Sequence, residues 1–63
     1  MYRLISYGYD NIVDRIEEDE DYYTLANIAI DICGSGCKFS DDPNGDGKIV
    51  VGDGYVRIYP ITE

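Results

Sequence analysis

Residues 37–61, CKFSDDPNGDGKIVVGDGYVRIYPI, decide the fold of this chain. Three short runs, CKFS, KIVV and YVRIYPI, are separated by two joints rich in Asp, Asn and Gly. Asn-Gly, Asp-Gly and Gly-Asp-Gly supply the positive φ that tight hairpins demand, so we expect a three-stranded antiparallel meander. In its last strand Val56 and Ile58 are expected to face a helix, and Pro60 to stop the strand or mark an edge.

The segment before the meander carries helical patterns. Apolar residues from Tyr22 to Cys33 recur at intervals of three and four, with carboxylates at 19–21 to complement the helix dipole and Gly34 to end the helix. A shorter pattern, NIVDRIEED at 11–19, follows the candidate N-cap Asp10. We expect one bent helix or two short helices.

The N-terminal run YRLISYG, residues 2–8, is aromatic and β-branched and predicts a first strand that Gly8 breaks. The predicted class is therefore α+β: an N-terminal strand, a helical middle and the C-terminal meander, with a single small sheet packed on helix. At 63 residues we expect a single domain, 1–63, with a thin core.

The charge balance restricts the partners that the protein can have. Thirteen acidic residues against five basic ones, with no histidine, give a net charge of −8. This balance opposes direct binding to nucleic acid or to an anionic membrane and favours a basic partner. No apolar run approaches the roughly 20 residues of a membrane span, and the start lacks the apolar block of a signal peptide, so we expect a soluble cytoplasmic protein.

Enzymatic activity is not expected from this sequence. The chain is short for a supported catalytic pocket. It also lacks histidine, a nucleophile elbow, a phosphate loop and a thiol with an evident base. We therefore expect a protein that acts by binding.

Residues 42–53, DPNGDGKIVVGD, resemble the EF-hand calcium loop, most closely its dockerin form. The resemblance implies oxygen ligands from Asp42, Asn44, Asp46, the carbonyl of Lys48, and Asp53. It covers this loop alone, because strands rather than helices are expected on both sides. With residues 49–51 extended, Asp53 would lie roughly 10 Å or more from Asp46, at about 3.3 Å per residue. We expect hairpin turns here, with a small calcium-binding module as the alternative.

The two cysteines are expected to be small core residues. Cys33 continues the apolar face of the predicted helix, and Cys37 alternates with Phe39. A local disulfide is the alternative. A zinc site is not expected, because the chain has no histidine and no second cysteine pair.

Acidic residues and tyrosines are the most unusual part of the composition. EEDED at 17–21 is a run of five carboxylates, which a solvated helix face would also explain. Among the seven tyrosines, Tyr55 and Tyr59 flank Arg57 on the predicted outward face. Tyrosine supplies rigid contact area at low entropic cost, so we expect these residues to contact a partner, or else to cover a thin sheet.

In size and composition the chain resembles the small acidic inhibitors of phages, which include anti-CRISPR proteins, anti-restriction proteins and uracil-DNA glycosylase inhibitors. The resemblance implies a non-enzymatic nucleic-acid mimic that blocks a basic nucleic-acid-binding surface of a partner, in the host cytoplasm if a phage encodes it. Carboxylates would replace phosphates, and aromatic rings would replace bases. The predicted contact residues are Glu17, Glu18, Asp19, Glu20 and Asp21, followed by Tyr55, Arg57 and Tyr59. Adaptation to high salt is a third interpretation of the acidity.

Overall fold

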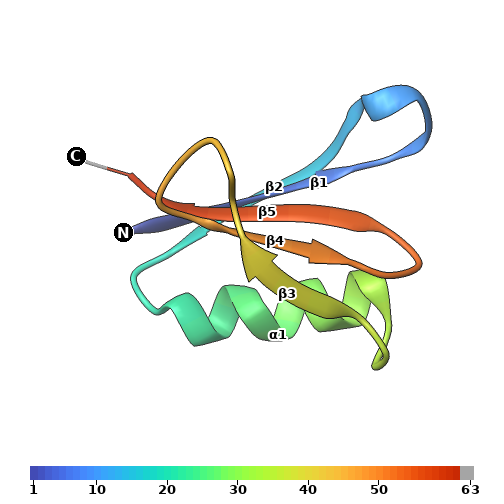
Figure 1. Cartoon of the computed structure of the whole chain (residues 1–63). Coiled ribbons are helices and arrows are strands. Elements are labelled where there is room, and N and C mark those ends of the chain that lie inside the picture. The colour runs from blue at the N-terminus through green and yellow to red at the C-terminus, as the bar shows by residue number, and fades with distance from the viewer. Residues whose placement is uncertain (62–63) are drawn as a thin grey trace.

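The computed structural model describes residues 1–61, which form five strands, one α-helix and one 3-10 turn (Figure 1). In chain order these are β1 (Tyr2–Tyr7), η1 (Tyr9–Asn11), β2 (Val13–Asp19), α1 (Tyr22–Cys33), β3 (Lys38–Asp41), β4 (Lys48–Val51) and β5 (Tyr55–Pro60). No helix in this part of the chain is long and apolar enough to cross a membrane.

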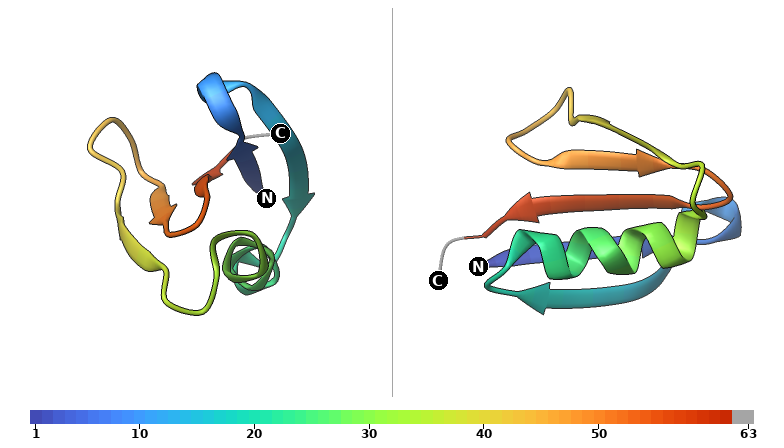
Figure 2. Two further views of the ribbon diagram at one scale, coloured as in Figure 1. Left: turned by 90° about the vertical axis from the view of Figure 1, so that its right-hand side faces the viewer. Right: turned by 90° about the horizontal axis from the view of Figure 1, so that it is seen from below.

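The strands form one antiparallel sheet in the order β2-β1-β5-β4-β3. The sheet curves around α1, which lies against one face, and the β1–β2 and β3–β4 hairpins project to the other side (Figure 2). The α+β class is confirmed, whereas the layout of the N-terminal strand and of the C-terminal meander differs in detail from the prediction. The sheet is larger than predicted, because β1 pairs with β5 and β2 adds an edge strand.

The predicted helix at 11–19 is wrong, because residues 13–19 form strand β2. Asp10 is not an N-cap: it has a left-handed φ of 63° in η1, next to Asn11 at 60°. Asp and Asn adopt this conformation more readily than most residues, and here they turn the chain between β1 and β2.

The predicted helix from Tyr22 to Cys33 is confirmed at both ends. The Asp21 side chain accepts a hydrogen bond from the Tyr23 amide at 3.0 Å, which makes Asp21 the N-cap. At the other end Gly34 has a φ of 92°, and its amide donates to the Ile30 carbonyl at 2.8 Å. A positive φ favours glycine at this position.

The core lies between α1 and the inner face of the sheet. It consists of Leu4, Leu25, Ala29, Cys33, Val50, Val56 and Ile58. Strand residues alternate between the two faces, so the neighbours of Val56 and Ile58 in β5 point away from the helix. The predicted inward orientation of Val56 and Ile58 is confirmed, and Pro60 ends β5.

The two glycine-rich joints are hairpin connections, as predicted, but the expected reason for their glycines is wrong. Among the glycines of residues 1–61, Gly34 alone has a positive φ. Gly47 is required for a different reason: a Cβ there would collide with the carbonyl oxygen of Ile58 and lie 2.7 Å from the Cβ of Tyr59. The glycine therefore allows the chain entering β4 to pass close to β5.

Candidate binding site

The face of the sheet opposite α1, which we call the open face, carries aromatic, apolar and arginine side chains. The ladder positions on this side are Arg3, Ile5 and Tyr7 of β1, Val13, Ile16 and Glu18 of β2, Lys38 and Ser40 of β3, Ile49 and Val51 of β4, and Tyr55, Arg57 and Tyr59 of β5. The predicted outward orientation of Tyr55, Arg57 and Tyr59 is confirmed.

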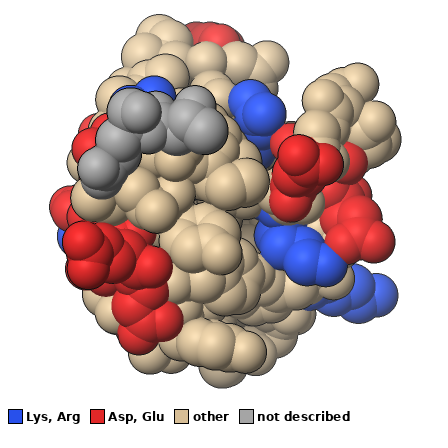
Figure 3. All heavy atoms as spheres, turned by 90° about the vertical axis from the view of Figure 1, so that its left-hand side faces the viewer, with Lys and Arg blue, Asp and Glu red and all other residues tan. Residues whose placement is uncertain are grey.

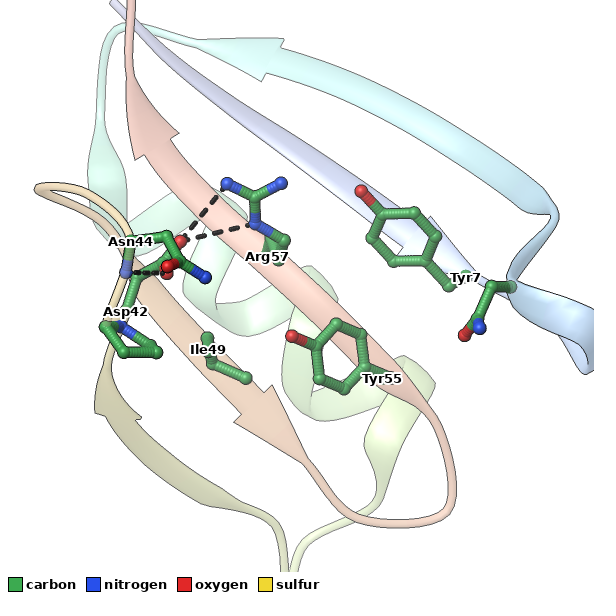
Figure 4. A pocket seen from close by; sticks show the side chains of 8 residues that line it. Tyr7, Asp42, Asn44, Ile49, Tyr55 and Arg57 are labelled. Carbon is green, nitrogen blue, oxygen red and sulfur yellow. Dashed lines mark hydrogen bonds and ion pairs between the residues drawn. The ribbon is translucent and has the colours of Figure 1, made fainter.

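A pocket of about 390 Å³ lies on the open face, between the β1–β2 and β3–β4 hairpins (Figure 4). Strands β1, β4 and β5 contribute Tyr7, Ile49, Tyr55 and Arg57. The hairpins contribute the remaining lining residues, which are Asn11, Asp42, Pro43 and Asn44. Residues 7–11 and 42–57, which are far apart in the sequence, therefore contribute to one site.

An ion pair between Asp42 and Arg57 joins one hairpin to the sheet at this pocket. Oδ2 of Asp42 accepts hydrogen bonds from Nε and Nη2 of Arg57 at 3.3 and 3.2 Å. Oδ1 of Asp42 accepts a third hydrogen bond, from the amide of Asn44 at 2.9 Å. Only 4% of the Asp42 side chain is exposed, against 36% for Arg57.

Tyr7 and Tyr59 lie near the Arg57 guanidinium, and Tyr55 packs beside Tyr7. The rings of Tyr7 and Tyr55 are 5.7 Å apart between centroids. On the far side, Cζ of Arg57 lies 5.3 Å from the ring centroid of Tyr59, within the range of a cation–π contact. The Tyr7 hydroxyl and then Asp42 raise the pKa of Arg57, so this side chain keeps its positive charge.

The acidic residues at 17–21, which we call the acidic segment, lie away from this pocket. Glu17, Glu18 and Asp19 belong to the edge strand β2, and Glu20 and Asp21 connect it to α1. Glu18 pairs with Arg3 at 2.7 Å, and Glu17 pairs with Arg15 at 3.1 Å. The carboxylate of Asp19 accepts from the Asp21 amide at 2.8 Å, and that of Asp21 caps α1.

Arg3 connects the acidic segment to the open face. Its Nε contacts Glu18, and its Nη1 donates to the Tyr59 hydroxyl at 3.5 Å. Tyr59 and then Glu18 raise the pKa of Arg3. Viewed from the end at which both termini lie, acidic side chains gather mainly in two groups, and Lys and Arg are interspersed mostly with one of them (Figure 3).

The structure disperses the residues of the calcium-loop resemblance. Asp42 and Asn44 line the pocket, and Asp46 is exposed in the β3–β4 connection. Lys48 begins β4, where its side chain pairs with Asp41. Asp53 lies in the β4–β5 turn, where its amide donates to the Cys33 carbonyl at 2.8 Å. Within residues 1–61 no three His, Cys, Asp or Glu side chains are grouped in a way that could hold a metal ion.

Both cysteines have free thiols. Cys33 belongs to the core, and its Sγ donates a weak hydrogen bond to the Val50 carbonyl at 3.7 Å. Burial raises the pKa of the Cys33 thiol. Cys37 is partly buried and packs against the core. The predicted core role is confirmed for Cys33 and, at the core's margin, for Cys37.

Sequence reasoning missed Tyr7 and Asn11 as pocket residues. The alternation in YRLISY indicates that Arg3, Ile5 and Tyr7 share a face, but their placement beside β5 depends on a pairing that the sequence does not reveal. Comparisons of the chain with protein-family models, curated proteins and solved structures found no match.

Proposed function

We propose that this chain is a non-enzymatic acidic binding protein that occupies a basic nucleic-acid-binding surface of a partner. The observation that carries the proposal is the acidic segment, in which five consecutive carboxylates follow an edge strand and the adjoining connection. Within residues 1–61, Asp19, Glu20 and Asp21 make no ion pair with Lys or Arg. No cation among the described residues therefore neutralises them, although the carboxylates of Asp19 and Asp21 also accept hydrogen bonds from backbone amides.

The spacing of these carboxylates supports nucleic-acid mimicry. A β-strand advances about 3.3 Å per residue, and one strand of duplex DNA carries a phosphate about every 3.4 Å along its axis. Successive acidic residues of β2 thus advance along the strand at about the axial interval of DNA phosphates, with their side chains on alternate faces. Alternation directs Glu18 to the open face and Glu17 and Asp19 to the side of α1, so charge surrounds the edge.

The open face supplies the second contact that we propose, through Tyr55, Arg57 and Tyr59. Tyrosine and arginine are among the residue types that most often dominate binding energy at interfaces. Because Arg3 links Glu18 to Tyr59, a partner that engages β2 along its open side would also reach this aromatic surface. The mechanism is steric and competitive, with no chemical step.

The proposal is tested by displacement of a labelled DNA duplex from purified CRISPR effector complexes, restriction endonucleases and uracil-DNA glycosylase. The test variant neutralises the acidic segment through E17Q, E18Q, D19N, E20Q and D21N. Asparagine is also a good N-cap, so α1 is preserved. A matched control neutralises five acidic residues outside the segment through D10N, D14N, D31N, D46N and D53N. Each variant changes the net charge from −8 to −3, since −8 + 5 = −3.

We expect the natural sequence and the control to displace DNA from at least one of these partners and the test variant to fail. Equal displacement by both variants would show that total charge, not the acidic segment, is responsible. A ternary complex of protein, partner and DNA, or no displacement from any partner, would contradict the proposal.

A further inference from the structure

We propose that the pocket between the two hairpins binds a small aromatic carboxylate, with Arg57 as the residue that receives the carboxylate group. This inference does not depend on the proposed function, because the pocket contains no residue of the acidic segment.

The arrangement of the ion pair presents a cation to the pocket. The Asp42 side chain is almost completely buried and uses both of its oxygens within the protein. It lies beside the guanidinium, which remains about one-third exposed (Figure 4). Asp42 engages Nε and Nη2 of Arg57, which leaves the N–H groups of Nη1 outside the ion pair. A molecule that enters the pocket thus meets a guanidinium held in place by Asp42, a lining residue whose two oxygens are already hydrogen-bonded.

The other polar groups of the pocket suit the same kind of ligand. The hydroxyls of Tyr7 and Tyr55 point to the side of the pocket where Arg57 lies (Figure 4). Hydroxyl groups and side-chain amides, here those of Asn11 and Asn44, can donate hydrogen bonds to carboxylate oxygens. An arginine already oriented by a carboxylate offers parallel N–H donors with little loss of side-chain entropy.

The remaining surface of the pocket is apolar and favours a flat apolar ligand. Ile49, Pro43 and the two tyrosine rings supply this surface. The volume of about 390 Å³ exceeds what a carboxylate alone would occupy and falls within the range of small-molecule sites, about 300–1,000 Å³. An aromatic ring beside the tyrosines, with its carboxylate at Arg57, would satisfy both parts of the pocket.

The acidic segment opposes an anionic ligand only weakly at this position. Asp42 and Arg57 cancel one another locally. The acidic segment begins on β2, which is two strands from β5 in the sheet. At about 4.8 Å per strand this is roughly 10 Å. That distance is about one screening length at physiological ionic strength, so the acidic segment adds little repulsion at the pocket.

The test is an NMR titration of the isotope-labelled full chain with benzoate, benzamide and benzamidinium. These probes share one ring and nearly one shape but carry charges of −1, 0 and +1. We expect benzoate to cause saturable shifts in the signals of Tyr7, Asn44, Tyr55 and Arg57, including Nε–H of Arg57. Benzamide should bind about tenfold more weakly, the effect of losing one charge-assisted hydrogen bond. Benzamidinium should shift signals of residues 17–21 instead.

Two variants separate the pocket from the rest of the open face. Arg57→Lys keeps a positive charge for Asp42 but loses the planar fork, so benzoate affinity should fall about tenfold. Arg3→Lys changes the same residue type on the same face outside the pocket and should leave the affinity unchanged. If Arg57→Lys does not fold, Tyr55→Phe replaces it, with a loss of a few-fold expected from one hydroxyl. Equal binding of benzoate and benzamide, unchanged affinity in the pocket variants, or shifts outside the pocket would overturn the proposal.

Discussion

The buried carboxylate of Asp42 holds Arg57 through two hydrogen bonds and thereby fastens the β3–β4 connection to the open face of the sheet. Asp42 also closes its own loop, because its amide donates to the Gly47 carbonyl at 3.0 Å. One aspartate thus shapes the hairpin and orients the arginine at the pocket.

Arg57→Gln should lower the free energy of unfolding by about 1–3 kcal/mol, since it leaves the Asp42 carboxylate buried without its cation. The matched control is Arg3→Gln, which removes an ion pair whose side chains are 37% and 44% exposed. Its expected cost is below about 1 kcal/mol. Urea unfolding at neutral pH measures the free energy of unfolding of both variants. Equal losses would show that the Asp42–Arg57 pair contributes no more to stability than the exposed Arg3–Glu18 pair.

Gly47→Ala should destabilise the protein by about 1–3 kcal/mol or more, because the added methyl group would press on the β5 backbone. Gly45→Ala is the control in the same connection, since a Cβ there has no neighbour within 4 Å. We expect its effect to stay within about 0.5 kcal/mol. Thermal unfolding compares the two, and a Gly47→Ala protein as stable as Gly45→Ala would contradict the described packing of β4 against β5.

The error in β2 shows why local periodicity misled the prediction. Val13 and Ile16 are three residues apart, a helical interval, and in a regular strand they would face opposite sides. A bulge places Val13 opposite Tyr7 and Ile16 opposite Ile5, so both reach the open face. The interval is thus produced by a strand irregularity that only the pairing with β1 reveals. Where local pattern and tertiary contact agreed, as in α1 and β5, the prediction was correct.

The candidate site was less predictable than the fold. Alternation in YVRIYPI was enough to place Tyr55, Arg57 and Tyr59 outward. The sequence predicted hairpin turns at Asp42 and Asn44, with a calcium loop as the alternative. It did not predict a pocket there, because Arg57, the partner of Asp42, lies 15 residues away. The pocket depends on long-range pairing of β1 with β5, and no local pattern specifies that pairing.

Stability should decline as pH rises above about 9, because Cys33 is buried as a neutral thiol. Burial raises the pKa of Cys33 above its ordinary value of 9.0, so the unfolded chain releases this proton at lower pH than the folded chain. The contribution of the neutral Cys33 thiol to stability is fully present below the pKa that this thiol has in the unfolded chain. It is lost as pH rises through the pKa that the thiol has in the folded chain. Desolvation likewise raises the pKa of Tyr22 above its ordinary value of 10.0. Ionisation of Tyr22 should therefore also lower stability as pH rises, but at a higher pH than ionisation of Cys33.

Urea unfolding midpoints between about pH 7 and pH 10 test this expectation, since the range spans the ordinary thiol pKa. Cys33→Ala should be less stable at neutral pH, through loss of packing, yet show a shallower decline at alkaline pH. An equally steep decline in both proteins would assign the alkaline loss to other groups.

Calcium should not specifically stabilise the protein. The Asp42 carboxylate is engaged by Arg57 and by the Asn44 amide, and Asp53 belongs to another turn. A thermal melt with millimolar calcium, beside magnesium and EDTA, should give the same midpoint in all three solutions. A rise of several degrees with calcium alone, equivalent to about 1 kcal/mol, would restore the calcium-binding alternative.

The salt dependence of partner binding is the most direct test of nucleic-acid mimicry by the acidic segment. For a partner found by DNA displacement, we predict that affinity falls at least about tenfold between about 50 and about 200 mM salt. The variant neutralised at residues 17–21 should lose most of this dependence, and the matched control neutralised elsewhere should retain it. Affinity that does not change with salt, or the same salt dependence in both variants, would contradict the proposed role of the acidic segment.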